Sequence, residues 1–153
     1  MRFWDSSAIV SVLSRQVAST VVRDLLQADE AVAVWWGTWV ECSVAINRLK
    51  REGKLSKESE EGARTRLDRL AQVWTEIEPL DDLCILSSLV SRDHPLKAAD
   101  ALQLAAALRW CEGDPANAGF VCLDDRLRTA ASEEGFAVLP ERSAAGIKAG
   151  EDA

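Results

Sequence analysis

Short apolar runs alternate with stretches of helical periodicity along this chain of 153 residues. The apolar runs predict five strands, at residues 2–4, 31–34, 74–78, 119–123 and 136–139. The second run is apolar at every position, as strands buried in a parallel sheet are. The repeated strand-then-helix order, with short connections, predicts an α/β fold with a central parallel sheet.

Capping and stop residues mark the expected helices. Ser56 and Asp124 are suited to begin helices, and Gly53 and Gly135 are suited to end them. We expect helices at residues 6–13, 17–28, 38–52, 57–73, 81–92, 96–111 and 125–134. Residues 1–140 are expected to form one domain. Residues 141–153 lack periodicity and are expected to form a flexible tail.

The composition is that of a soluble globular protein, with 48% hydrophobic and 28% charged residues. No stretch approaches the roughly 20 apolar residues that span a membrane, and no signal peptide is visible, so a cytoplasmic protein is expected. His94 is the only histidine, which excludes a zinc site built on several histidines and disfavours a Ser-His-Asp triad. We expect it to be a structural turn residue. The cysteines show no CxxC spacing and are expected to be reduced core residues: Cys42, Cys84, Cys111 and Cys122.

A net charge of −7 argues against nonspecific binding to polyanions. The charge is uneven, however, because basic residues outnumber acidic ones by three between positions 48 and 69. This segment is either an ordinary solvated helix surface or an arm that contacts phosphates. The candidates for contact with an RNA backbone are Arg48, Lys50, Arg51 and Lys54.

Four acidic residues stand where the chain is otherwise apolar: Asp5, Glu41, Asp100 and Asp124. Asp5 and Asp124 end strands, and ligands of open parallel sheets bind at the carboxyl ends of the strands. Two unscreened carboxylates about 4 Å apart repel by roughly 4 kcal/mol at an effective dielectric near 20. If the four acids converge, a cation or a proton must offset them, and Mg²⁺ or Mn²⁺ prefers such oxygen ligands.

Taken singly, two of these acids have a simple structural explanation. Asp5 and Asp124 could each cap the helix that follows, with a gain of about 1 kcal/mol. Ser7 could add a hydroxyl that points to the same place as Asp5. Asp125 is adjacent to Asp124 but further from the strand end, so we expect Asp124 to face the crevice and Asp125 to be a supporting or solvated neighbour.

The other two acids differ from each other. The segment 38–41 matches a capping box with Thr38 as the cap and Glu41 reaching back, and on its own we would favour that box. Asp100 lies in an Ala/Leu-rich helix, where a carboxylate without a partner is costly, and Lys97 is the nearest cation. For Asp100 we therefore favour a functional role.

Three tryptophans precede Glu41, at Trp35, Trp36 and Trp39. They could stack on nucleotide bases. Their large apolar area favours a place in the core or in a dimer contact.

Together these segments resemble the PIN-domain family, and specifically the VapC-type toxins of toxin–antitoxin pairs. The resemblance spans nearly all of residues 2–140. It is carried by Asp5-Ser6-Ser7-Ala8, by Glu41, by ADALQLAAA at residues 99–107, by FVCLDDRL at residues 120–127, and by Ala130-Ala131 and Gly135. One departure is Cys122, where relatives often carry Thr or Ser.

The resemblance implies a Rossmann-like three-layer fold and an endoribonuclease that depends on Mg²⁺ or Mn²⁺. It also implies a homodimer and a cognate antitoxin that inserts into the acidic cleft. By position, the catalytic acids become Asp5, Glu41, Asp100 and Asp124, with Asp5, Asp100 and Asp124 as metal ligands. Glu41 is then either a further ligand or a base that positions water.

Two rival functions remain at this stage. One is a noncatalytic module that binds RNA or a partner protein on the same fold. The other is phosphoryl transfer through an aspartyl phosphate. We rank phosphoryl transfer last, because the residue two positions after Asp5 is Ser7 rather than another acid.

Overall fold

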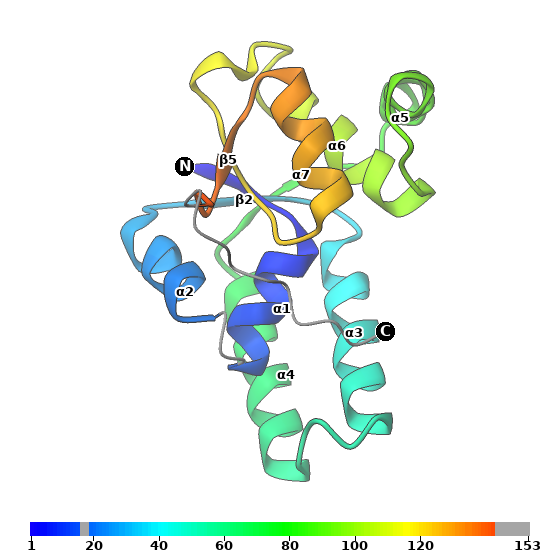
Figure 1. Cartoon of the computed structure of the whole chain (residues 1–153). Helices are drawn as coiled ribbons and strands as arrows, with labels where there is room; N and C mark the ends of the chain where they lie inside the picture. Colours follow the sequence, from blue (N-terminus) through cyan, green and yellow to red (C-terminus); the bar gives the residue numbers. More distant parts are fainter. Residues whose placement is uncertain (16–18, 143–153) are drawn as a thin grey trace.

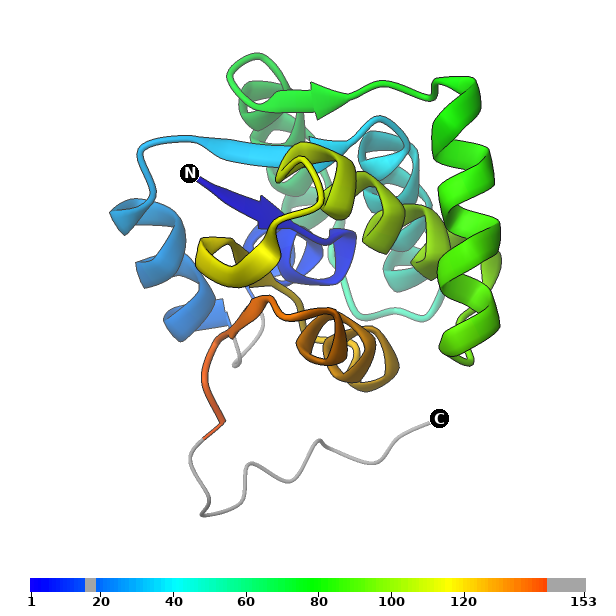
Figure 2. The same ribbon diagram turned by 90° about the horizontal axis from the view of Figure 1, so that it is seen from above.

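The structure, a computed structural model, describes residues 1–15 and 19–142. Its centre is a sheet of parallel strands: β1 (Arg2–Trp4), β2 (Val32–Trp35), β3 (Thr75–Ile77), β4 (Gly119–Val121) and β5 (Ala137–Leu139). Their order is β3-β2-β1-β4-β5, and Figure 2 shows it from β3 in green at one edge to β5 in orange at the other. The predicted α/β fold with a central parallel sheet is confirmed.

Helices cover both faces of this sheet (Figure 1). One face carries α1 (Ser6–Ser14), α2 (Ser19–Ala28), α3 (Thr38–Arg51) and α4 (Lys57–Ala71), and the other carries α5 (Asp81–Asp93), α6 (Ala98–Trp110) and α7 (Asp125–Glu134). Successive strand residues point to opposite faces, so Phe3 packs in the core under α5 to α7 and Trp4 packs in the core under α1 to α4. The predicted three-layer arrangement is thus confirmed.

The strand order reverses beside β1. The chain moves outward from β1 to β2 and β3, and then returns to place β4 on the other side of β1. The carboxyl ends of β1 and β4 lie side by side, because the Asp5 amide donates to the Val121 carbonyl at 2.9 Å. This is the point of an open parallel sheet where ligands bind.

Element ends differ from the sequence prediction by a few residues, as with β4, which ends at Val121 rather than at 123. The reason is local: the Leu123 amide donates to the Ser7 hydroxyl at 2.9 Å instead of continuing a strand ladder. A short 3-10 helix at Pro115–Asn117 was not predicted. The predicted caps Ser56 and Asp124 and the stop at Gly135 are all confirmed. Most of the predicted tail, at residues 143–153, lies outside the described residues.

His94 is a structural turn residue, as predicted. Its buried ring lies 3.0 Å from Glu133 Oε2 and 2.8 Å from Glu134 Oε1, and so joins the α5–α6 turn to the end of α7. All four cysteines are free thiols, but Cys84 is exposed, which corrects its predicted place in the core. Within the described residues, no helix has the length and apolar character needed to cross a membrane.

Candidate active site

The four acids predicted from the sequence line one cleft, although they come from four separate elements. Its volume is about 330 Å³, and it lies at the carboxyl ends of β1 and β4. The residues that line it are Asp5, Ser6, Ser7, Val10, Glu41, Ala45, Arg48, Asp100 and Asp124. We refer to this cavity as the acidic cleft.

Asp5 is both a helix cap and a wall of the cleft. Its side chain is only 3% exposed, and its Oδ2 accepts hydrogen bonds from the Ser7 amide at 3.0 Å, from the Ser7 hydroxyl and from the Cys122 thiol at 3.5 Å. All of these bonds go to Oδ2. Capping therefore leaves Oδ1 available to a ligand, and the two interpretations of Asp5 are compatible.

Burial raises the pKa of Asp5 from 3.8 to about 6, and the negative charge of Glu41 adds to the increase. The hydrogen bonds from Ser7 and Cys122 act in the opposite direction but do not cancel it. A cation next to this carboxylate would be strongly favoured, because it would offset the cost of the buried charge.

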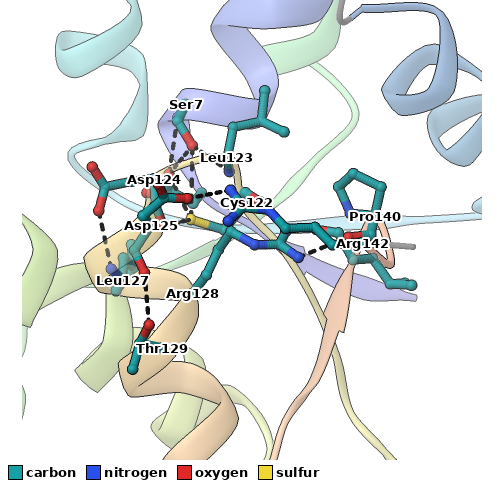
Figure 3. A network of polar contacts seen from close by, with 12 residues as sticks. Ser7, Cys122, Leu123, Asp124, Asp125, Leu127, Arg128, Thr129, Pro140 and Arg142 are labelled. Carbon is teal, nitrogen blue, oxygen red and sulfur yellow. Dashed lines mark hydrogen bonds and ion pairs between the residues drawn. The ribbon is translucent and has the colours of Figure 1, made fainter. Parts of the chain in front are cut away.

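Ser7 joins the two strand ends that form the cleft. Its hydroxyl donates to Asp5 Oδ2 and accepts from the Leu123 amide, so the β1–α1 turn is fixed to the loop after β4 (Figure 3). Cys122 lies in the same network, fully buried, with its sulfur 3.6 Å from the Asp124 carbonyl oxygen and 3.8 Å from the Ser7 hydroxyl. Here a thiol occupies the position at which the sequence departs from the family resemblance.

The predicted capping box at Thr38 and Glu41 is wrong. The residue before α3 is Gly37, which makes no side-chain cap, and the Glu41 amide bonds to the Gly37 carbonyl at 3.0 Å. A Cβ at Gly37 would lie 2.3 Å from the Trp35 ring nitrogen, so the close indole requires glycine there. Helix α3 thus begins one residue earlier than the box needs, and Glu41 lies a full turn inside it.

The Glu41 carboxylate is instead held by donors from three elements. Oε2 accepts from the Ser6 hydroxyl of α1 at 2.8 Å, and Oε1 accepts from the Trp35 ring of β2 at 3.2 Å and from the Gln103 amide of α6 at 3.3 Å. Partial burial raises the pKa of Glu41, these donors lower it, and the charge of Asp100 raises it further.

Gln103 was not identified from the sequence as a site residue. It is fully buried, its Nε2 also lies 3.4 Å from Thr38 Oγ1, and its Oε1 has no hydrogen-bond partner among the described residues. The sequence signal that could have identified Gln103 is that it is the only polar side chain in the apolar stretch 101–108 of α6. Ser6 and Trp35 were missed as partners of Glu41 because their contact depends on how α1 and β2 pack.

Asp100 and Asp124 form the more open side of the cleft. Asp124 is exposed and caps α7 by accepting from the Leu127 amide at 3.0 Å. Asp100 lies half-buried at the exposed start of α6, rather than within its buried part as predicted, and its predicted neighbour Lys97 makes no ion pair with it. Burial first, and then the charge of Asp124, raise the pKa of Asp100, while Lys97 and Arg126 lower it.

Of the predicted RNA-backbone residues, Arg48 alone lines the acidic cleft. Lys50 lies 3.6 Å from Glu60 and Lys54 lies 3.0 Å from Glu52, so both are engaged in surface ion pairs. Arg51 is exposed. Asp125 does not line the acidic cleft and forms an ion pair with Arg142.

The three tryptophans near Glu41 differ in exposure. Trp35 is 7% exposed and bonds to Glu41, which agrees with a core position. Trp36 and Trp39 are 50% and 41% exposed. They are therefore available for contact with another molecule.

The donor chemistry of the cleft fits a hydrated divalent cation. Among residues 1–15 and 19–142, no three Asp, Glu, His or Cys side chains are arranged to hold a metal ion by themselves. Mg²⁺ does not require such a set, since it commonly keeps several waters and uses one or two carboxylates. Three oxygen-donor carboxylates with raised pKa values and one exposed arginine leave negative charge for such an ion to offset.

The sequence matches the PIN domain family over residues 2–112. The chain therefore belongs to the PIN domain family, in agreement with the resemblance noted from its motifs. None of the curated proteins matches the chain significantly.

Solved structures share this fold at low sequence identity. A toxin–antitoxin complex from Klebsiella pneumoniae is 18% identical, with a TM-score of 0.56 over 81% of this chain and 87% of that one. FitAcB from Neisseria gonorrhoeae is 16% identical, with a TM-score of 0.61 over 92% of this chain and 97% of that one. A protein from Pyrobaculum aerophilum is 18% identical, with a TM-score of 0.57 over 90% and 88%. At these identities the likeness shows the fold.

Proposed function

We propose that this PIN-domain protein is a metal-dependent endoribonuclease and the toxin of a toxin–antitoxin pair. The observation that carries the proposal is the meeting of Asp5, Glu41, Asp100 and Asp124 in one cleft at the strand-order reversal. Family membership and the toxin–antitoxin complex among the structural neighbours support it. The cofactor would be Mg²⁺ or Mn²⁺, because four carboxylates provide hard oxygen donors.

The chain's own residues divide the work of phosphodiester hydrolysis. Asp5, Asp100 and Asp124 would hold the metal, which when bound supplies charge to offset the phosphate and lowers the pKa of water. Glu41, fixed by Ser6, Trp35 and Gln103, would accept a proton from the attacking water or orient it. Arg48 would hold the RNA backbone at the rim of the cleft. No histidine is needed for these steps.

An RNA cleavage assay with purified, antitoxin-free protein tests the proposal. We expect cleavage of structured RNAs with Mg²⁺ or Mn²⁺, no cleavage with EDTA, and loss of cleavage in Asp5→Ala. Inactivity of the purified protein, or full activity of Asp5→Ala, would refute the proposal. Mapping of cleavage ends on total RNA would then identify the target.

A noncatalytic module that binds RNA or protein is the second candidate. It is favoured by the exposed Trp36 and Trp39, which are available for contact with another molecule. It predicts that Mn²⁺ changes neither binding nor stability. Calorimetric titration with Mn²⁺ separates the two functions, because the nuclease requires a saturable heat that Asp5→Ala abolishes.

Partners follow from the same proposal. A cognate antitoxin would insert into the acidic cleft, and two copies of the chain would form a homodimer in the cytoplasm. An exposed apolar surface at the start of α3 is available for the homodimer: Trp36, Trp39, Val40 and Val44. Light scattering on Val40→Asp tests this, since an unchanged dimer would exclude that surface.

A further inference from the structure

A second cavity opens beside the acidic cleft. Its volume is about 450 Å³, and it shares Asp100 and Asp124 with the cleft. Two cations line it from opposite elements: Lys97 immediately precedes α6, and Arg126 lies in the first turn of α7. Both side chains are exposed. Arg48 of α3 lines only the acidic cleft and this pair lines only the second cavity, and the two cavities meet at Asp100 and Asp124.

Neither of these cations is held by a close contact with a carboxylate. Within the described part of the chain neither makes a hydrogen bond or an ion pair, although Asp100, Asp124 and Asp125 line the same cavity. Lys50 and Lys54 differ, since each pairs with a glutamate. Lys97 and Arg126 are thus free to bind an external anion.

Their positions are also unfavourable for helix stability. The amino end of a helix carries a partial positive charge, so a cation there costs about 0.3–1 kcal/mol relative to its favourable place at the carboxyl end. Both Lys97 and Arg126 are at such an end. A residue that disfavours its own helix without a compensating contact is expected at functional positions.

We propose that Lys97 and Arg126 form a phosphate-binding subsite that holds the RNA backbone next to the acidic cleft. This inference rests on the proposed nuclease function and adds a second point of backbone contact to Arg48. Arginine provides a planar set of donors for phosphate oxygens, and lysine provides a compact charge. With a cation on each side of the acids, a single strand would lie across the cleft with one phosphodiester over the carboxylates.

The same placement predicts opposite effects on two ligands. Both cations line the cavity that shares Asp100 and Asp124 with the acidic cleft, so they lie close enough to repel a metal ion held there. Removing them should weaken the binding of RNA and strengthen the binding of Mn²⁺. Damage to the fold would weaken both.

The test compares Lys97→Ala, Arg126→Ala and the double variant with Arg92→Ala, which removes a positive charge from an exposed position on α5 that lines neither cavity. The steady-state cleavage of a single-stranded RNA is measured with Mn²⁺ at several salt concentrations. Mn²⁺ binding is measured by calorimetry without RNA. Lys97→Arg and Arg126→Lys test whether charge alone restores function.

We expect KM to rise with kcat nearly unchanged, and the slope of log(kcat/KM) against log[salt] to become shallower by about 0.7 for each lost cation. Mn²⁺ affinity should rise in the double variant, and Arg92→Ala should match the wild type in all three measurements. An active wild type with variants of unchanged KM and slope would overturn the subsite alone. Variants that lose Mn²⁺ affinity would also overturn it, whereas an inactive wild type would refute the nuclease function itself.

Discussion

The two sides of the acidic cleft are built in different ways. Asp5 and Glu41 form a held side, where every described hydrogen bond comes from a donor fixed by α1, β2, β4 or α6. Asp100 and Asp124 form an open side, partly or fully exposed and next to two cations that no close contact with a carboxylate holds. Rigid, buried groups suit a role that requires fixed geometry, and exposed groups suit ligands that exchange. The difference indicates that the held side fixes the geometry of the reacting groups, whereas the open side lets ligands enter and leave.

The largest expected effect is a difference in cleavage activity between substitutions on the held side and on the open side. In Asp5→Asn the side chain can still cap α1, since Asn caps helices as well as Asp does, but the buried charge is lost. We expect cleavage to fall by at least about 10²-fold, without rescue by added Mn²⁺. Asp124→Asn should fall less and recover as the Mn²⁺ concentration is raised. Steady-state assays over a Mn²⁺ series measure both.

Asp68→Asn is the matched control for this pair, because Asp68 is exposed on α4 and lines neither the acidic cleft nor the cavity beside it. It should retain wild-type activity. Equal, non-rescuable losses in Asp5→Asn and Asp124→Asn would remove the distinction between the two sides.

The second expected effect concerns stability without metal. The pKa of Asp5 in the folded protein is about 6, above its ordinary 3.8, so between these values the folded state binds a proton that the unfolded state has released. Stability must therefore fall as the pH rises through this interval, by up to about 3 kcal/mol from this group. Glu41 and Asp100, whose pKa values are also raised, act in the same direction.

Urea unfolding of the metal-free protein between pH 4 and pH 8 measures this effect. The stability of the wild type relative to Asp5→Asn should decrease as the pH rises, and Mg²⁺ should restore it above pH 6. A difference between the two proteins that is independent of pH would show that Asp5 does not carry an uncompensated charge.

The third expected effect tests the support of Glu41. Gln103→Met keeps the length of the side chain but removes the amide that donates to Glu41, and losses of this kind typically cost 10- to 100-fold in activity. The fold should be nearly as stable as before, because the substitution also removes a buried Oε1 that has no described partner. Thermal unfolding and kcat are measured together, with exposed Gln27→Met as the control.

A merely structural Gln103 would show the opposite pattern. Activity would then follow the fraction of folded protein, and the pH profile of kcat would keep its shape. A shifted profile in folded Gln103→Met would identify Gln103 as a positioning residue for Glu41.

The fold could be predicted from the sequence because its signals are local. Apolar runs, caps such as Ser56 and Asp124, and the stop at Gly135 each depend on a few neighbouring residues. Glu41 shows where such reasoning fails: the local match to a capping box favoured that role, yet α3 begins after Gly37 and the Glu41 carboxylate bonds to Ser6, Trp35 and Gln103. Tertiary packing thus overrode the role that the local sequence favoured.

Some residues of the candidate site could likewise be predicted from the sequence, and others could not. The four acids were recognisable by their type and order, and the structure brings them to one cleft. The contact of Gln103 with Glu41 and the pairing of Lys50 with Glu60 depend on which helix faces which, and no short segment contains that information. Of the four basic candidates, only Arg48 lines the cleft.

The smallest expected effect concerns Cys122, which belongs to the held side by contact. Its thiol is a weak donor at 3.5 Å from Asp5 Oδ2, so Cys122→Ser should change activity by no more than about fivefold, since a weak bond contributes less than about 1 kcal/mol. Cys42→Ser is the control, because the only hydrogen bond of that buried thiol within the described part of the chain goes to the Ser6 carbonyl, at 4.0 Å. If Cys122→Ser instead lost activity more than tenfold while remaining folded, the held side would depend on the size or the weak hydrogen bonding of sulfur. The stronger donation of a hydroxyl to Asp5 would then be harmful, because it lowers the basicity of that carboxylate.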